Sequence, residues 1–245
     1  MCGPLFLGRP CRSGKAGQGQ SAIMEIPSIR DLAMRPAVWY FDPISPFSYL
    51  HIKQFDKLPA DLAIEYVPVL FAGLLKANGQ KGPAEIAAKR VQTYRICVHM
   101  AKQAGIPFRF PPAHPFNPLH ALRLLCGAGA TAANVHAVFD CIWKDGRDVN
   151  APDTFAALAA QLGVSDAATL IARPEVKQTL IANTGRAVAR GVYGVPTFDF
   201  GGELFWGSDS IGLMNAYAAD AGLFAAGEMA RVSDLPVAAA RKEAG

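Results

Sequence analysis

The chain has 245 residues and a mass of 26.1 kDa, which suits one large α/β domain or a domain that carries an insertion. Hydrophobic residues make up 51% and charged residues 18%, so the chain can bury a large core and is not mainly disordered. The formal net charge is only +4, and neither a nucleic-acid nor a membrane partner is expected. Five cysteines without C-x-x-C spacing exclude a disulfide scaffold and a dithiol enzyme, and we expect a cytoplasmic protein.

The amino end is expected to be an extension, residues 1–36, outside the fold. Residues 8–20 are Gly-rich and basic without apolar periodicity, and the apolar run at residues 5–7 is too short for a signal peptide. Met24 is a plausible alternative start. Cys2 and Cys11 fall in this extension and are not expected to be catalytic.

The first strong element is the aromatic and β-branched run at residues 37–42, which is typical of a central strand buried on both faces. Ser45 then stands at an N-cap position with Pro46 at the first helical position, predicting a helix to about residue 57. Residues 62–67 predict a second strand.

Helical periods replace this pattern between about residues 74 and 191. Helices are predicted over 84–104, 119–125, 132–144, 153–162 and 174–190. Strands return at 197–200 and 203–206 as a tight hairpin, followed by a helix over 211–221 and a frayed tail after about residue 227.

This order of elements predicts an α/β protein with a thioredoxin-like fold and a large α-helical insertion. The thioredoxin-like domain is assigned to 37–75 and 192–225, and the inserted helical domain to 76–191. Residues 226–245 are assigned to a C-terminal tail.

In a thioredoxin-like fold the reacting group stands at the amino end of the helix after the first strand, where a thiolate is stabilised. Here that position reads Ser45-Pro46-Phe47-Ser48, with serines in place of a C-x-x-C pair. A serine hydroxyl is a poor redox group, but it can donate a hydrogen bond to another molecule's thiolate. The pattern therefore indicates a borrowed thiol, and glutathione is the obvious small thiol of the cytoplasm.

Two further segments suit a glutathione site. Val195-Pro196 stands directly before the third strand and is a candidate cis peptide bond that would present the Val195 main chain to an extended peptide. Trp206-Gly207-Ser208-Asp209 stands at the next strand-to-helix junction, where Ser208 and Asp209 are expected to cap the helix and hold the γ-glutamyl group. Each motif alone also suits an ordinary turn or cap.

Together these motifs resemble the 2-hydroxychromene-2-carboxylate isomerases, relatives of the kappa-class glutathione transferases and of the DsbA-type oxidoreductases. The resemblance covers residues 37–223 and is carried by residues 41–50, 191–198 and 202–209. It implies that Ser45 faces the glutathione sulfur as the catalytic residue and that Val195, Pro196 and residues 206–209 contact glutathione. It also implies a homodimer.

The resemblance extends to an aromatic carboxylate substrate. Residues 71–79 match the family's loop after the second strand, which makes Lys76 and Asn78 candidate substrate ligands, and Phe116-Asn117-Pro118-Leu119 matches a second motif that supplies Asn117 and Pro118. The asparagine typical of the family after the loop glycine is replaced by Gln80. Lys89 matches a lysine that contacts glutathione in the kappa-class relatives, although a surface lysine explains it equally well.

No histidine spacing indicates a metal site. The five histidines are interpreted as surface residues, and Cys97, Cys126 and Cys141 as buried thiols.

The resemblance implies a glutathione-dependent cis–trans isomerase that converts 2-hydroxychromene-2-carboxylate to trans-o-hydroxybenzylidenepyruvate, by reversible thiolate addition, in the catabolism of aromatic hydrocarbons. Two alternatives stay open. One is a kappa-like transferase that conjugates glutathione to electrophiles, and the other is a non-catalytic thioredoxin-like binding protein.

Overall fold

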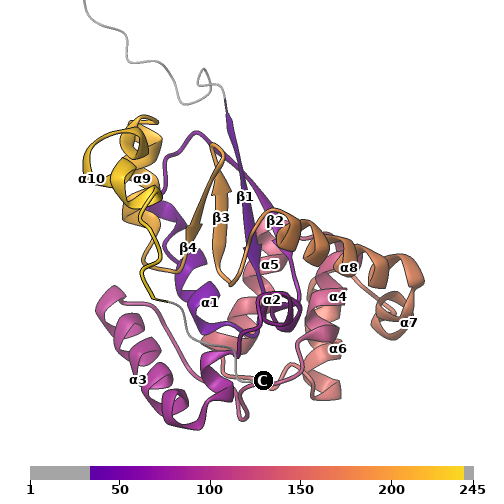
Figure 1. Cartoon of the computed structure of the whole chain (residues 1–245). Helices are drawn as coiled ribbons and strands as arrows, with labels where there is room; N and C mark the ends of the chain where they lie inside the picture. Colours follow the sequence, from indigo (N-terminus) through magenta and orange to yellow (C-terminus); the bar gives the residue numbers. More distant parts are fainter. Residues whose placement is uncertain (1–33, 240–245) are drawn as a thin grey trace, which may run out of the picture. The chain divides into compact units, whose positions relative to one another are not determined.

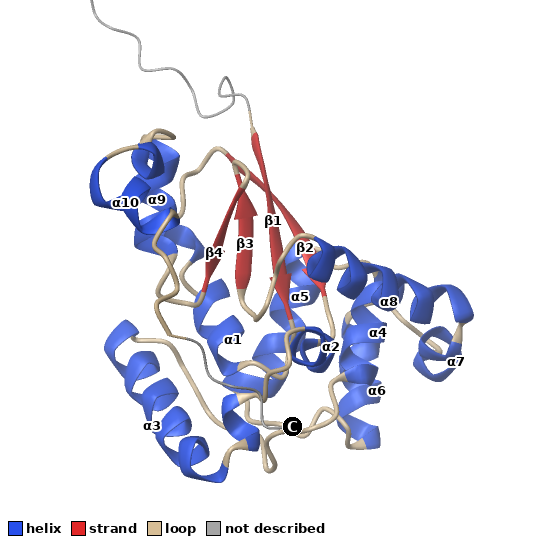
Figure 2. Cartoon of the chain, viewed as in Figure 1, coloured by secondary structure: helices blue, strands red, loops and turns tan. Residues whose placement is uncertain are grey.

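The computed structural model describes residues 34–239, so the expectations for Cys2, Cys11 and Met24 lie outside the described residues. Its centre is a four-stranded sheet in the order β2-β1-β3-β4 (Figures 1 and 2). β1 (Arg35–Phe41) pairs in parallel with β2 (Leu62–Pro68) and antiparallel with β3 (Thr197–Phe200), which pairs antiparallel with β4 (Glu203–Trp206). The sheet confirms the predicted thioredoxin-like fold.

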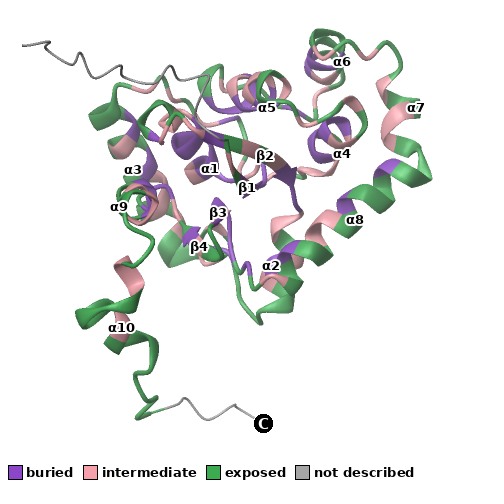
Figure 3. Ribbon diagram, turned by 90° about the horizontal axis from the view of Figure 1, so that it is seen from above, coloured by how far each residue is buried: buried purple, intermediate pink, exposed green. Residues whose placement is uncertain are grey.

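β1 is buried on both faces. Its alternate side chains point to opposite sides of the sheet, and each side is covered. Trp39 and Phe41 belong to the larger core cluster, whereas Tyr40 between them belongs to a second cluster with Val67 and Val195. Figure 3 shows helices on both sides of the sheet, with α2 and α8 on the side opposite to α1. A strand in this setting reads as a continuous apolar run, as residues 37–41 do.

Figure 1 labels the helices and colours them in the order of the sequence. The bounds are α1 Pro46–Ile52, α2 Phe71–Ala77, α3 Ala87–Ala104, α4 Leu119–Ala128, α5 Ala132–Phe139, α6 Pro152–Gln161, α7 Ala167–Ala172, α8 Pro174–Ala189, α9 Ile211–Ala219 and α10 Gly227–Ser233. Short 3-10 turns occupy Phe55–Lys57, Pro83–Glu85 and Leu223–Ala225, and a π-helix occupies Asp140–Lys144. Within residues 34–239, no helix is both long and apolar enough to cross a bilayer.

Several helices differ from their predicted form. The helix predicted over 84–104 is a 3-10 turn followed by α3, and the helix predicted over 132–144 is α5 continued by the π-helix. Residues 71–79 were expected as a loop, but α2 occupies most of them. The predicted fraying after residue 227 is wrong for residues 227–233, which form α10.

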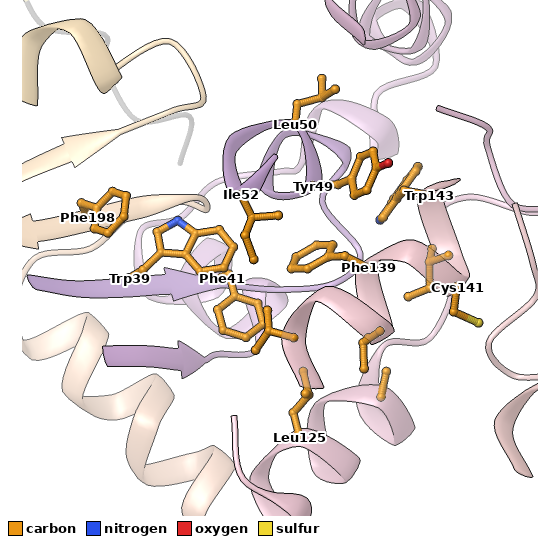
Figure 4. Close-up of a cluster of buried hydrophobic side chains, with 14 of the residues drawn as sticks. Trp39, Phe41, Tyr49, Leu50, Ile52, Leu125, Phe139, Cys141, Trp143 and Phe198 are labelled. Atoms are coloured by element: carbon orange, nitrogen blue, oxygen red, sulfur yellow. The ribbon is translucent and has the colours of Figure 1, made fainter. Parts of the chain in front are cut away.

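The larger core cluster joins the sheet to the helical segment between β2 and β3. Figure 4 shows Trp39 and Phe41 of β1 beside Phe139 of α5, with Tyr49 of α1 close to Trp143 of the π-helix. The ring centroids of Trp39 and Phe41 are 4.7 Å apart, and those of Phe41 and Phe139 are 5.7 Å apart. The two parts of the chain therefore share one core, while the boundaries assigned to the helical insertion stay a prediction.

Candidate active site

Ser45 caps α1 as the sequence predicts. It has extended main-chain angles, its Oγ accepts a hydrogen bond from the Ser48 N–H over 3.2 Å, and Pro46 opens the helix. Ser45 is 7% exposed. Within residues 34–239 no group accepts a hydrogen bond from the Ser45 hydroxyl, so its proton is available to a ligand.

Asp42 fixes the start of the loop that leads to Ser45. The residue has no exposed surface, and its two carboxyl oxygens accept the N–H groups of Ile44 over 3.0 Å and of Phe71 over 2.9 Å. Burial raises the pKa of this carboxyl to about 7, although both hydrogen bonds favour the charged form. Asp42 thus ties the Ser45 loop to the first residue of α2.

Two aromatic side chains from distant segments bind the carbonyl groups of the same loop. The Trp143 indole N–H donates to the Pro43 oxygen over 2.8 Å, and His114 Nε2 lies 2.9 Å from the Ile44 oxygen. Sequence reasoning missed these two residues and Asp42. No local pattern reveals them, because Trp143 and Pro43 are 100 positions apart and His114 and Ile44 are 70 apart.

The Val195–Pro196 peptide bond is cis, as expected. Tyr40 of β1 pairs with Thr197 of β3, so the Ser45 loop and the Val195 segment lie at the same end of two neighbouring strands. No hydrogen bond among the described residues engages the N–H or the C=O of Val195, which is 6% exposed. The main chain of Val195 therefore has an unpaired donor and acceptor beside the sheet.

The turn at residues 206–209 contacts the Val195 segment. The Gly207 N–H donates to the Pro196 oxygen over 2.9 Å. A side chain at Gly194 would collide with the Trp206 indole, so Trp206 lies directly against the main chain there. Gly207 has a φ of +98°, a conformation that favours glycine. These predicted glutathione-contact segments thus form one connected surface.

The predicted caps of the following helix are not observed. α9 begins at Ile211 after Ser210, and no side chain caps its amino end. Ser208 is buried and Asp209 is exposed, and neither donates to or accepts from the helix. The reason is geometric: Gly207 and the next three residues form a turn of their own, in which the Ser210 hydroxyl donates to the Gly207 oxygen over 2.8 Å.

The candidate substrate residues on the segment after β2 are exposed. Lys76 stands in the last turn of α2, and Asn78 ends that helix, where its side-chain amide donates to the Leu74 oxygen over 2.9 Å. Gln80 is exposed two residues later. Asp42 brings the amino end of α2 to the Ser45 loop, whereas these three side chains lie at and beyond its carboxyl end.

The second set of substrate candidates lies directly before α4. Asn117 is exposed and its Oδ1 accepts the Leu119 N–H over 3.0 Å, while Pro118 is the N-cap residue of α4. His114, three residues earlier, bonds the Ile44 oxygen and so brings this segment to the Ser45 loop. Lys89 is an exposed residue in the first turn of α3.

The interpretation of the histidines as surface residues is wrong for His51. This side chain of α1 has no exposed surface, its Nδ1 accepts the Trp39 indole N–H over 3.2 Å, and burial lowers its pKa to about 3. Cys97 and Cys141 are buried, and burial raises the pKa of their thiols. Unreactive neutral thiols are therefore expected at both positions.

Two cavities lie away from Ser45. One of about 780 Å³ is lined by residues of α6 and α7 with His120, and one of about 380 Å³ is lined by residues of α5 and the π-helix with Arg147. The lining of the first is mostly apolar. Neither cavity includes the predicted site residues.

A model of the DsbA-like thioredoxin domain matches residues 38–218. The 2-hydroxychromene-2-carboxylate isomerase of Pseudomonas putida is 30% identical over 186 residues, which cover 73% of this chain and 91% of that protein. The chain belongs to the 2-hydroxychromene-2-carboxylate isomerase family. The prediction of an isomerase is thereby confirmed at the level of the family.

A solved structure supports membership of the isomerase family. A 2-hydroxychromene-2-carboxylate isomerase is 26% identical, with a TM-score of 0.65 over 75% of this chain and 94% of the other. The family's kinship with kappa-class proteins appears as well: glutathione S-transferase kappa 1 of Caenorhabditis elegans is 23% identical, covering 72% of this chain and 87% of that protein.

Proposed function

We propose that this protein is a glutathione-dependent cis–trans isomerase that interconverts 2-hydroxychromene-2-carboxylate and trans-o-hydroxybenzylidenepyruvate. The observation that carries the proposal is the state of the Ser45 hydroxyl. Its oxygen accepts the Ser48 N–H, and its proton has no acceptor among the described residues. A hydroxyl oriented in this way can donate a hydrogen bond to a sulfur anion at the amino end of α1.

Glutathione fits the unpaired groups beside Ser45. The free N–H and C=O of Val195 suit the main chain of an extended peptide, and Asp209 is an exposed carboxylate for its ammonium group. When bound, glutathione supplies a thiolate whose reversible addition makes the conjugated double bond single, so that the substrate rotates before the thiolate is eliminated. The role of Ser45 is to hold that sulfur as the anion.

The proposed substrate is a small aromatic carboxylate. Lys76 offers a cation for its carboxylate, and the amide groups of Asn78 and Asn117 offer hydrogen bonds for its phenol and keto oxygens. Pro118 would add an apolar contact. The isomerase names of the relatives support this substrate class. The proposal also includes a homodimeric, cytoplasmic enzyme of aromatic hydrocarbon catabolism.

Replacement of the serine tests the proposal. Ser45→Ala is expected to lower kcat about 100- to 1000-fold, the usual loss when one donor to a reacting anion is removed. The free energy of unfolding should fall by only about 1 kcal/mol, because a single N-cap bond is lost. The measurement is chromene isomerisation followed by absorbance at saturating glutathione.

Ser165→Ala, a change at an exposed serine outside the site, is the matched control and should leave kcat unchanged. A Ser45→Ala enzyme that turns over at the wild-type rate would sink the assignment.

A glutathione transferase activity is the second candidate, because kappa-class relatives align with most of the chain. The same site would then stabilise the thiolate for conjugation to an electrophile. Parallel assays of chromene isomerisation and of chlorodinitrobenzene conjugation separate the two. Conjugation without isomerisation would establish the transferase and reject the isomerase.

A further inference from the structure

His114 connects three parts of the chain. It opens the segment that leads to Asn117, and its Nε2 lies 2.9 Å from the oxygen of Ile44, the residue directly before Ser45. Its Nδ1 lies 2.8 Å from the hydroxyl of Tyr94 on α3. Both ring nitrogens are therefore engaged, one by the Ser45 loop and one by α3, which lies beside α1 in Figure 1.

The direction of the bond to the loop follows from its acceptor. A carbonyl oxygen can only accept, so Nε2 carries a hydrogen and donates it to Ile44. The Tyr94 hydroxyl is 2.8 Å from Nδ1 and 2.7 Å from the main-chain oxygen of His114, and it serves Nδ1 as donor or as acceptor. The donation to Ile44 is thus the same whether the ring is neutral or charged.

The His114 ring is half-buried among aromatic rings, which restrict its orientation. Four aromatic rings surround it with centroids 5.3 to 6.1 Å away: Tyr94, Phe110, Phe116 and Trp143. Trp143 itself donates to Pro43, the residue before Ile44. The two carbonyl groups ahead of Ser45 are therefore bound by adjacent side chains whose rings pack on each other, with centroids 5.4 Å apart.

We propose that His114 is a positioning residue, which with Tyr94 holds the Ile44–Ser45 peptide so that the Ser45 hydroxyl points at the reacting sulfur. The proposal rests on the proposed function in so far as Ser45 serves a thiolate. The same contact holds the segment of Asn117 against the loop, so one side chain sets the spacing between the sulfur site and a candidate substrate residue. Misplacing a reacting group by about 1 Å can cost about 100-fold in rate.

The first measurement needs no ligand. The N–H groups of Ile44 and Ser45 both donate to Asp42, over 3.0 Å each, so their hydrogen exchange reports opening of the loop. His114→Phe keeps an aromatic ring in the enclosure and removes both nitrogens. We expect these two amides to exchange at least ten-fold faster in the variant than in the wild type. His120→Phe, a change at an exposed histidine of α4, is the control and should leave both rates unchanged.

The second measurement follows the consequence for the sulfur. The ultraviolet absorbance of the thiolate, titrated in the protein–glutathione complex, gives the pKa of the bound thiol. His114→Phe should raise that pKa and lower kcat about 10- to 100-fold with a smaller change in KM. His114→Gln retains an N–H donor near the Nε2 position and should recover part of both effects. A purely structural loss of packing would not be rescued by glutamine.

Tyr94→Phe gives the final check. It should weaken the site in the wild type and have little further effect in His114→Phe, because the two side chains act as one unit. Unchanged exchange of Ile44 and Ser45 in His114→Phe overturns the proposal, as does faster exchange with an unaltered thiol pKa and kcat. Should the wild type bind no glutathione, the proposed function fails, and the exchange comparison still decides whether His114 holds the loop.

Discussion

At the scale of single residues, Asp42 is a carboxyl group whose pKa is strongly shifted by burial. It is fully buried, and its pKa is raised from 3.8 to about 7 by the loss of solvent. Between these two values the folded protein holds a proton that the unfolded chain has released. The contribution of Asp42 to stability is therefore complete below about pH 4 and is lost as the pH rises towards and through about 7.

Asp42→Asn should reduce this dependence on pH. The asparagine cannot ionise, so the stability of the wild type relative to the variant should fall by up to about 4 kcal/mol between about pH 4 and about pH 8. The asparagine side chain has one NH2 group in place of a carboxyl oxygen, and this group cannot accept a hydrogen bond from the Ile44 or Phe71 N–H that it faces. The variant should therefore be less stable than the wild type at low pH. Urea unfolding at the two pH values measures both effects.

Asp153→Asn is the matched control for this comparison, because Asp153 is exposed on α6. Its effect should be the same at both pH values. An Asp42→Asn variant that tracks the wild type across the range would mean that the carboxyl is ionised throughout.

Part of the candidate site could be predicted from short sequence motifs. Ser45 with Pro46 and the cis Val195–Pro196 bond were predictable, because each is defined by its immediate neighbours. Trp143 and His114 were not, because their partners are 100 and 70 positions away and only the folded sheet and helices bring them together. The same limit explains the error at His51, whose burial depends on Trp39 in the neighbouring strand.

At the scale of elements, the strands were easier to predict than the short helices. β3 and β4 match their predicted bounds because a Gly-Gly turn separates two apolar runs. α2 buries only Leu74 and α10 buries no residue, and each has only seven residues, so neither gives a helical pattern long enough to stand out in the sequence. α7 was missed as well, although Ala167, Leu170 and Ile171 follow helical spacing and pack against the core, because the helix has only six residues.

α10 should contribute little to stability because it buries no residue. Ala230→Pro removes the bond from the Ala230 N–H to the Ala226 oxygen and should lower the free energy of unfolding by less than about 0.5 kcal/mol. Phe224→Ala, just before α10, should cost at least about 1 kcal/mol, because that ring stacks on Tyr217 at 5.1 Å. Chemical denaturation of both variants measures the difference. A larger loss for Ala230→Pro would show that α10 supports the core.

At the scale of the whole molecule, the charge is unevenly distributed. Residues 76–109 carry seven basic residues and one acidic residue, a net charge of +6 in a chain whose total is +4. The remaining residues together are therefore net negative. The basic residues are Lys76, Lys81, Lys89, Arg90, Arg95, Lys102 and Arg109. Most of them are exposed, so a positive potential is expected over this segment.

Such a potential should speed the arrival of anionic ligands. Glutathione and the proposed aromatic carboxylate are both anions, so kcat/KM should fall roughly two- to five-fold when the ionic strength rises from about 0.02 M to about 0.2 M. The value of kcat should change little, because screening acts on encounter. Steady-state kinetics in a potassium chloride series gives both constants.

Charge reversal separates this effect from general salt effects. The double variant Lys81→Glu with Lys102→Glu should flatten the salt dependence, because both side chains are exposed within the basic segment. Lys177→Glu, on the exposed surface of α8, should leave it intact. Equal salt dependence in the wild type and the double variant would remove any steering role for this segment.

The bond from Trp143 to Pro43 also bears on how the protein is made. Ser45 leaves the ribosome long before Trp143 has been synthesised, and a bond across 100 positions cannot form until the later residue exists. His114, which binds Ile44, is also translated well after the loop. The nascent chain therefore carries Ser45 in a loop that lacks both of these bonds until the later residues have been made. The loop acquires its final support late, when the helices up to residue 144 have been released and have packed against the first strand.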